Sequence, residues 1–215
     1  SLKYFLVLLI VGVAWCAASE VVSPHSSNTN SGLGIYDGKP TTIQKHPYLA
    51  TLLWKNSLWC AGTIVSPSWV ITTGDCALNS SISDLSVVVG SSDGINGKKY
   101  QVKSSIIHPK FTYPDDDYDY ACIQIKGKFK WSSKTKPIKL GTKEPKANTK
   151  LIVAGYGATG DWADAFVYKN AVYSLFAFGA KFGFCSSGAH PCGLADITAG
   201  ASWIKKITGA KYDYE

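Results

Sequence analysis

Hydrophobic residues in the middle of the chain gather in short runs, which polar and turn-forming residues separate. The runs are rich in valine, isoleucine, tyrosine, threonine and tryptophan, and their spacing of about ten residues is typical of a β-sandwich or β-barrel. We therefore predict an all-β fold. The predicted strands cover residues 48–54, 58–66, 69–73, 85–90, 98–108, 121–127 and 150–157.

The N-terminal region has a different pattern. Lys3 precedes an apolar stretch that ends at Trp15, and small residues follow, so we predict a signal peptide over residues 1–18 and a secreted, extracellular protein. Residues 19–34 are rich in serine and asparagine and have no periodicity, which predicts a propeptide-like linker. No later apolar stretch approaches the length that spans a bilayer, so we expect no membrane association.

One helix is predicted near the C-terminus, in the segment ASWIKKITGAK (201–211). Trp203, Ile204 and Ile207 fall on one face of such a helix. The chain of 215 residues is 46% hydrophobic and 17% charged, which is ordinary for a globular protein.

The net charge is +7, and all 22 basic residues are lysines. A basic protein attracts acidic partners, but lysine lacks the planar fork with which arginine binds phosphate groups. The lysines form no run of five or more. We therefore expect no nucleic-acid partner.

Removal of the signal peptide leaves five cysteines, so at least one thiol stays free or pairs with another chain. The cysteine spacings resemble no zinc site, and we expect neither a metal nor a cofactor. Asn79 begins the only N-glycosylation sequon, in a polar loop.

Several motifs from Ile35 onward resemble, in order, the chymotrypsin-like family of serine proteases. The resemblance implies one trypsin-like domain over residues 35–215, with a chymotrypsin-like double β-barrel and a C-terminal helix. The matching motifs are IYDG (35–38), WCAGTIVSPSWVITTGDC (59–76), DYDYACIQI (117–125), VAGYGATG (153–160) and ADITAGASWIKKI (195–207).

The resemblance also implies that the catalytic triad is degenerate. That family needs a serine nucleophile, a histidine base and an aspartate that orients the histidine. Asp119 matches the aspartate, but Asp75 stands at the histidine position, and a carboxylate is a feeble base for a serine hydroxyl. Counting back from the C-terminus aligns GDWADA (160–165) with the serine motif, which puts Trp162 at the nucleophile position.

Two other family positions are retained in this alignment. Gly160 matches the oxyanion-hole glycine, and Asp161 matches the acid that pairs with the new N-terminus, here Ile35. Ala163 and Asp164 replace two glycines where the backbone turns tightly, so we expect a disturbed oxyanion hole.

The segment between GYG (155–157) and GDW (160–162) is much shorter than in the family, so we expect a truncated second barrel. The resemblance implies a disulfide between Cys60 and Cys76. Cys185 lacks its family partner and either pairs with Cys192 or stays free. Cys122 lies in an apolar strand, where an inert buried thiol is expected.

Other candidate catalytic groups are weaker. The segment GSSDG (90–94) matches a nucleophile elbow, but a turn and a strand follow it where the elbow requires a helix. His46 and His108 each precede proline, and we interpret both as structural, as we do His190 in its loop.

The resulting hypothesis is a secreted, catalytically inactive serine protease homologue that binds other proteins as a monomer. Its substitutions resemble those of inactivated paralogues in parasitic mites, related to the group 3 mite allergens. That resemblance implies host defence proteins, complement components among them, as partners. Two alternatives stay open: an active trypsin-like endopeptidase whose triad is misaligned here, and a poorly folding product with little function.

Overall fold

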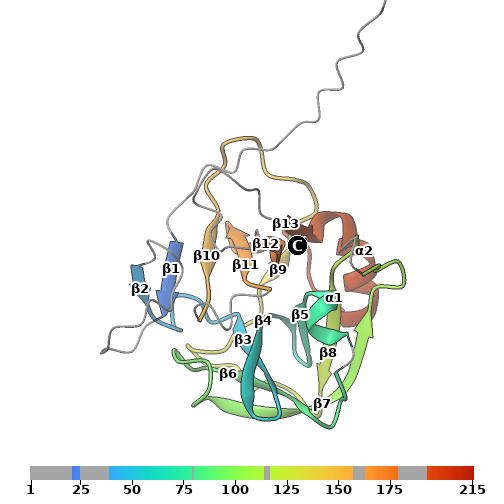
Figure 1. Ribbon diagram of the computed structural model, residues 1–215. Coiled ribbons are helices and arrows are strands. Elements are labelled where there is room, and N and C mark those ends of the chain that lie inside the picture. Colours follow the sequence, from blue (N-terminus) through green and yellow to red (C-terminus); the bar gives the residue numbers. More distant parts are fainter. Residues whose placement is uncertain (1–20, 25–38, 79, 114–116, 157–162, 179–192) are drawn as a thin grey trace, which may run out of the picture.

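The computed structural model describes residues 21–24, 39–78, 80–113, 117–156, 163–178 and 193–215 (Figure 1). The first half forms a closed barrel of β3, β4, β5, β8, β7 and β6, in that order. The bounds are Leu49–Trp54 (β3), Ser57–Ser66 (β4), Trp69–Thr72 (β5), Leu85–Val89 (β6), Lys98–Ile107 (β7) and Ala121–Ile125 (β8). These strands confirm the all-β prediction and differ from the predicted ranges by at most two residues at either end.

The barrel closes around aliphatic side chains. Leu52, Ile64, Val87 and Ile123 come from four different strands and are completely buried. The β-branched residues that dominate these strands pack well on a pleated surface, which is why the runs form strands. Each barrel strand pairs with two neighbours, so the barrel has no open edge.

The second half of the chain, together with the N-terminal strands β1 and β2, forms a seven-stranded sheet in the order β13-β12-β11-β10-β1-β2, with β9 also paired to β12. Strand β1 lies within the segment predicted to be a linker, and it runs parallel to both β10 and β2. The bounds are Val21–Pro24 (β1), Lys39–Thr41 (β2), Lys139–Leu140 (β9), Ile152–Ala154 (β10), Ala165–Tyr168 (β11), Ala171–Phe178 (β12) and Gly193–Asp196 (β13).

The C-terminal helix α2 spans Ile197–Thr208 and begins four residues before the predicted start. Asp196 caps its N-terminus: the side chain accepts a hydrogen bond from the backbone N–H of Thr198 at 2.8 Å. Gly209 ends the helix with a φ of 67°, in the left-handed region that glycine adopts without strain. The cap aspartate therefore moves the start of the helix forward.

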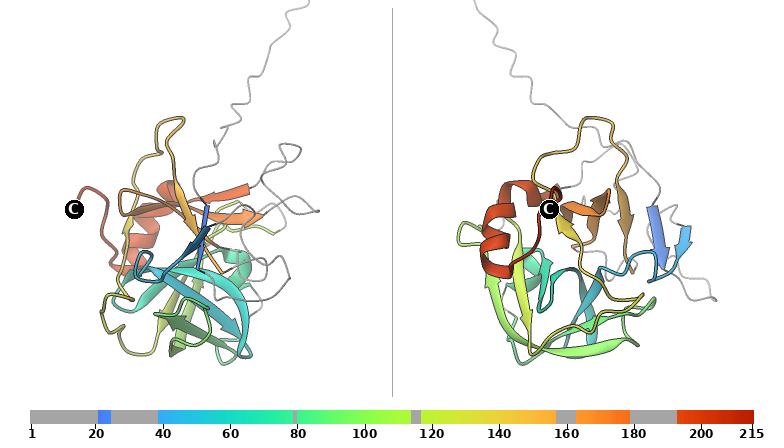
Figure 2. Two further views of the ribbon diagram at one scale, coloured as in Figure 1. Left: turned by 90° about the vertical axis from the view of Figure 1, so that its left-hand side faces the viewer. Right: turned by 180° about the vertical axis from the view of Figure 1, so that it is seen from behind.

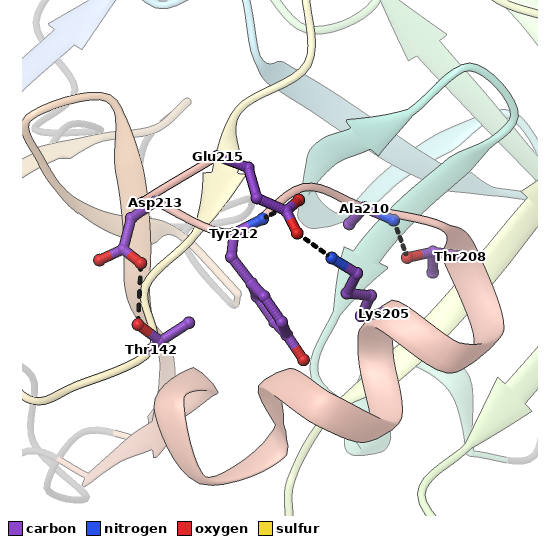
Figure 3. Close-up of polar contacts among 7 residues, drawn as sticks. All are labelled: Thr142, Lys205, Thr208, Ala210, Tyr212, Asp213 and Glu215. Carbon is purple, nitrogen blue, oxygen red and sulfur yellow. Dashed lines mark hydrogen bonds and ion pairs between the residues drawn. The ribbon is translucent and has the colours of Figure 1, made fainter.

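The last residues of the chain hold α2 and the second sheet together (Figure 3). The carboxylate of Asp213 accepts a hydrogen bond from Thr142 Oγ1 at 2.8 Å. Glu215 forms an ion pair with Lys205 of α2. The Lys205 amine also lies 4.1 Å from the centre of the Tyr212 ring. The C-terminus is thus tied to both elements.

Helix α2 also packs against the barrel half. Tyr120 precedes β8 and is 2% exposed, and its ring lies where a Cβ on Gly200 of α2 would stand. Trp203 of the same helix packs 5.8 Å from the Tyr120 ring, centre to centre. The helix is drawn in red in both views of Figure 2, beside the second sheet and against the barrel.

We expect Gly200→Ala to destabilise the protein, since the added methyl group would overlap the buried Tyr120 ring. Overpacking of this kind costs about 1–3 kcal/mol of unfolding free energy. Chemical denaturation of the two proteins measures the difference. Ser202→Ala is the matched control, because Ser202 is exposed on the same helix and should lose no stability. Equal stability of Gly200→Ala and wild type would contradict the close packing.

Candidate functional site

Asp75 lies on the short helix α1 (Gly74–Ala77), which follows β5 directly. Its side chain is exposed, whereas Gly74 and Cys76 on either side are buried. A disulfide joins Cys76 to Cys60 of β4, with their Cα atoms 6.2 Å apart. The predicted Cys60–Cys76 pair is thereby confirmed, and it fixes the backbone that carries Asp75.

Asp119 lies just before β8 and is 1% exposed. Its Oδ1 accepts a hydrogen bond from the backbone N–H of Asp75 at 3.0 Å. A Cβ on Gly74 would lie 3.1 Å from the same oxygen, so glycine lets α1 approach the carboxylate closely. The structure thus brings together Asp75 and Asp119, the two residues that the resemblance places at the family's histidine and aspartate positions.

The residues on either side of Asp119 in the sequence, Tyr118 and Tyr120, belong to a cluster of aromatic rings. His108 stacks on Tyr118 with ring centres 4.8 Å apart, and its ring meets Trp203 edge-on at 4.8 Å. The Nδ1 of His108 accepts a hydrogen bond from the backbone N–H of Lys110 at 3.2 Å. Burial and then Lys110 lower the pKa of His108 below its usual value. These contacts agree with the structural role predicted for His108.

Ala163 adopts a φ of 72°, in the left-handed region that favours glycine. Its N–H donates to the carbonyl oxygen of Phe176 at 2.9 Å, and the N–H of Phe176 donates to the carbonyl oxygen of Asp164 at 2.9 Å. The backbone at Ala163 therefore adopts a conformation that glycine reaches more easily than alanine does.

Asp164 is 2% exposed, and its carboxylate occupies the space where a Cβ on Gly155 would stand. Burial and then the Asp164 charge raise the pKa of Tyr48, and the same carboxylate contributes to the raised pKa of Tyr156. The burial of this acid differs from the prediction, which placed Asp164 only in a disturbed turn. The available signal was a carboxylate directly before the apolar strand β11.

Several predicted site residues lie outside the described residues. Residues 1–20 and 25–38, which include most of the predicted signal peptide and linker, also lie outside them. The site residues concerned are Ile35, Asn79, Gly160, Asp161, Trp162, Cys185 and Cys192. Their predicted roles stay predictions.

Cys122 is a free thiol and is completely buried in β8. Burial raises its pKa well above the usual value, which keeps the thiol protonated and unreactive. Among the described residues, no three histidine, cysteine or acidic side chains come together as metal ligands. No helix in that part of the chain is long and apolar enough to cross a membrane.

Comparison with known proteins establishes the family. Residues 35–175 match the trypsin family. The chain is 28% identical over 163 residues to a trypsin from Phaedon cochleariae, covering 74% of this chain and 61% of that protein. It is 31% identical over 141 residues to human granzyme M, covering 62% of this chain and 53% of that protein. The chain belongs to the trypsin family of serine proteases.

The fold has relatives among solved structures. The scabies mite inactivated protease paralogue S-D1 superposes with a TM-score of 0.65 at 17% identity, covering 78% of this chain and 94% of that one. This agreement confirms a chymotrypsin-like fold, with a closed barrel, a second sheet and a C-terminal helix. The matches to the trypsin and granzyme M span 61% and 53% of the lengths of those proteins.

We expect the paired replacement of Cys60 and Cys76 by alanine to lower the unfolding free energy by about 3 kcal/mol, as is usual for a loop of this size. The disulfide closes a loop with a sequence separation of 16 and restricts the unfolded chain. Thermal melts with and without reductant measure the effect. Reductant should lower the wild-type midpoint and leave that of the variant unchanged. An unfolding midpoint of wild type that is the same with and without reductant would contradict this assignment.

His46 gives a prediction about pH. It is 7% exposed, its Nδ1 lies 3.2 Å from Tyr48 Oη, and burial followed by Lys45 lowers its pKa from 6.5. The unfolded chain therefore binds a proton at His46 before the folded protein does. The stabilisation by neutral His46 is complete above pH 6.5 and is lost as the pH falls through the lower folded-state pKa.

Urea denaturation of wild type and His46→Gln at several pH values between about 7.5 and 5 tests this linkage. The unfolding free energy of wild type should fall more steeply with decreasing pH than that of the variant. The difference between the two curves cancels the contribution of other titrating groups. Parallel curves would show that His46 has the same pKa in the folded and unfolded states.

Proposed function

We propose that this protein is a secreted, catalytically inactive member of the trypsin family that acts by binding other proteins. The observation that carries the proposal is the place of Asp75. It lies on α1 with its N–H bonded to the buried carboxylate of Asp119, where a triad would need an imidazole. A carboxylate at this position keeps the backbone contact with Asp119 but cannot act as the histidine base.

The substitution removes the proton transfer that a serine protease needs. A carboxylate is a feeble base for a serine hydroxyl, and two neighbouring carboxylates repel each other. In our sequence alignment Trp162 takes the nucleophile position, and loss of that serine alone costs roughly a million-fold in turnover. The alanine at position 163 adds a strained turn next to the proposed oxyanion hole.

The scaffold itself is suited to binding. The barrel and the disulfide next to Asp75 are intact, so loops on this surface stay fixed after catalysis is lost. A solved structure with the same fold is named an inactivated protease paralogue of the scabies mite. We extend the proposal to host defence proteins, including complement components, because the substitutions resemble those of such paralogues.

The test of inactivity is labelling with a fluorophosphonate probe, which modifies activated serines, together with turnover of a broad panel of peptide substrates. We expect wild type to show neither, because the general base is missing. Asp75→His should also stay inactive, since a histidine alone does not supply the nucleophile. An active trypsin serves as the positive control, and a cooperative thermal melt verifies that the sample is folded.

Labelling of wild type would overturn the proposal and favour an active endopeptidase with a triad elsewhere in the chain. Labelling that appears only in Asp75→His would mean that an activated serine exists, and that Trp162 does not occupy the nucleophile position. A sample without a cooperative melt would favour a poorly folding product over a binding protein.

The partner is tested separately. Complement activation in serum is measured with increasing amounts of the folded protein, and a heat-unfolded sample serves as the control. We expect a dose-dependent decrease with the folded protein alone. No decrease would rule out complement as the target and direct the search for a partner to other defence proteins.

A further inference from the structure

A basic pocket lies at the end of the barrel where β6 ends and β7 begins. It has a volume of about 320 Å³, which is at the lower end of the range for ligand sites. Its walls come from the end of β6, the start of β7 and the loop of residues 130–135, and none of the proposed triad positions lines it. The lining includes Lys98, Tyr100, Lys130, Trp131, Ser132 and Lys134.

Three lysines give this pocket its charge. Lys98, Lys130 and Lys134 are exposed, and no ion pair or ring contact engages their amines in the described part of the chain. Lys126, Lys128 and Lys136 flank this loop in the sequence and are exposed, and residues 126–140 contain no acidic residue. Lysines that lie more than thirty residues apart in the sequence, Lys98 and Lys134, thus line one pocket with Lys130.

The turn between β6 and β7, residues 90–97, contains one acid, Asp93. Although burial opposes its ionisation, hydrogen bonds from Ser91, Asn96 and Ile95 lower the pKa of Asp93. Its carboxylate is held by these groups of its own turn. Asp93 therefore does not pair with the pocket lysines.

Aromatic side chains form an apolar wall beside the lysines. Tyr100 meets Phe129 edge-on with ring centres 5.1 Å apart, and Phe129 packs 6.1 Å from Trp131. Phe129 is buried, whereas Trp131 is 46% exposed and offers an apolar face to solvent. Tyr100 Oη also accepts a hydrogen bond from the N–H of Lys130 at 3.3 Å.

The pocket is held in place before any ligand arrives. Ser132 and Thr135 exchange two backbone hydrogen bonds of 3.1 and 3.3 Å, which close the loop. Gly90 has a φ of 77°, and a Cβ there would lie 3.1 Å from Thr135 Oγ1, so the loop lies tightly against the end of β6. Such preorganisation reduces the entropy that binding would otherwise cost.

We propose that this pocket and the lysines of the adjoining loop bind a sulfated polysaccharide. One sugar unit would lie against Trp131 in the pocket, with its sulfate groups near the three lysine amines. The loop lysines outside the pocket favour a polymer with repeated charges over a single small anion. Lysine amines are point charges that suit sulfate in many orientations, whereas the absence of arginine disfavours bidentate phosphate recognition.

The test measures binding of the full protein to a sulfated heparin octasaccharide by calorimetry at low and physiological salt. We expect the triple variant Lys98→Gln/Lys130→Gln/Lys134→Gln to bind roughly tenfold more weakly, the effect of losing three exposed ion pairs. The matched control is Lys143→Gln/Lys146→Gln/Lys150→Gln, which loses the same charge from the exposed loop before β10, on the opposite side of Figure 1 from β6 and β7. It should change affinity less than about threefold, because distant charges are screened by salt.

Further ligands test whether the site recognises a sulfated sugar or only negative charge. The desulfated octasaccharide should not bind, and Trp131→Ala should weaken binding of the sulfated one. Equal loss in the two triple variants would overturn the proposal, since net charge would then explain the affinity. No binding by wild type would overturn it as well. Tighter binding of polyglutamate or of single-stranded DNA of equal charge would assign the surface to an acidic protein or a nucleic acid instead.

Discussion

Contact between helix α2 and Tyr120 joins the two halves of this fold, and the arrangement around Asp119 depends on it. Glycine at position 200 lets the helix backbone lie against the tyrosine ring, and Trp203 and His108 complete the packing. Asp119 is adjacent in sequence to this buried tyrosine. Its carboxylate is therefore fixed toward α1, where it accepts the hydrogen bond from Asp75. Without the helix, the loop before β8 would lose its support on one side.

The same region shows how the backbone that carries Asp75 is held in place. The contacts that position Asp75 are the disulfide, the approach of Gly74 and a backbone hydrogen bond. None of them involves the side chain at position 75. That side chain is exposed, so the contacts that hold the backbone here do not depend on the type of residue at position 75.

The seven-stranded sheet is built differently from the barrel. It includes parallel pairs that join β1 to β10 and β2, and β9 to β12. Asp164 is buried, its carboxylate lies against the backbone at Gly155, and its charge contributes to the raised pKa values of Tyr48 and Tyr156. The barrel half, in contrast, is closed and has an aliphatic core.

The sequence by itself determined the strands of the barrel and, through the resemblance of its motifs to the trypsin family, the disulfide between Cys60 and Cys76. Alternating β-branched runs and ordered motifs are local signals, and each is readable without knowledge of the fold. It did not reveal the start of α2 at its cap, strand β1, the burial of Asp164 or the basic pocket. Strand β1 and the pocket depend on pairing between distant segments: lysines near residues 98 and 130 become neighbours only when the barrel closes. The tertiary structure brings these charges together, so their proximity cannot be read from the order of residues.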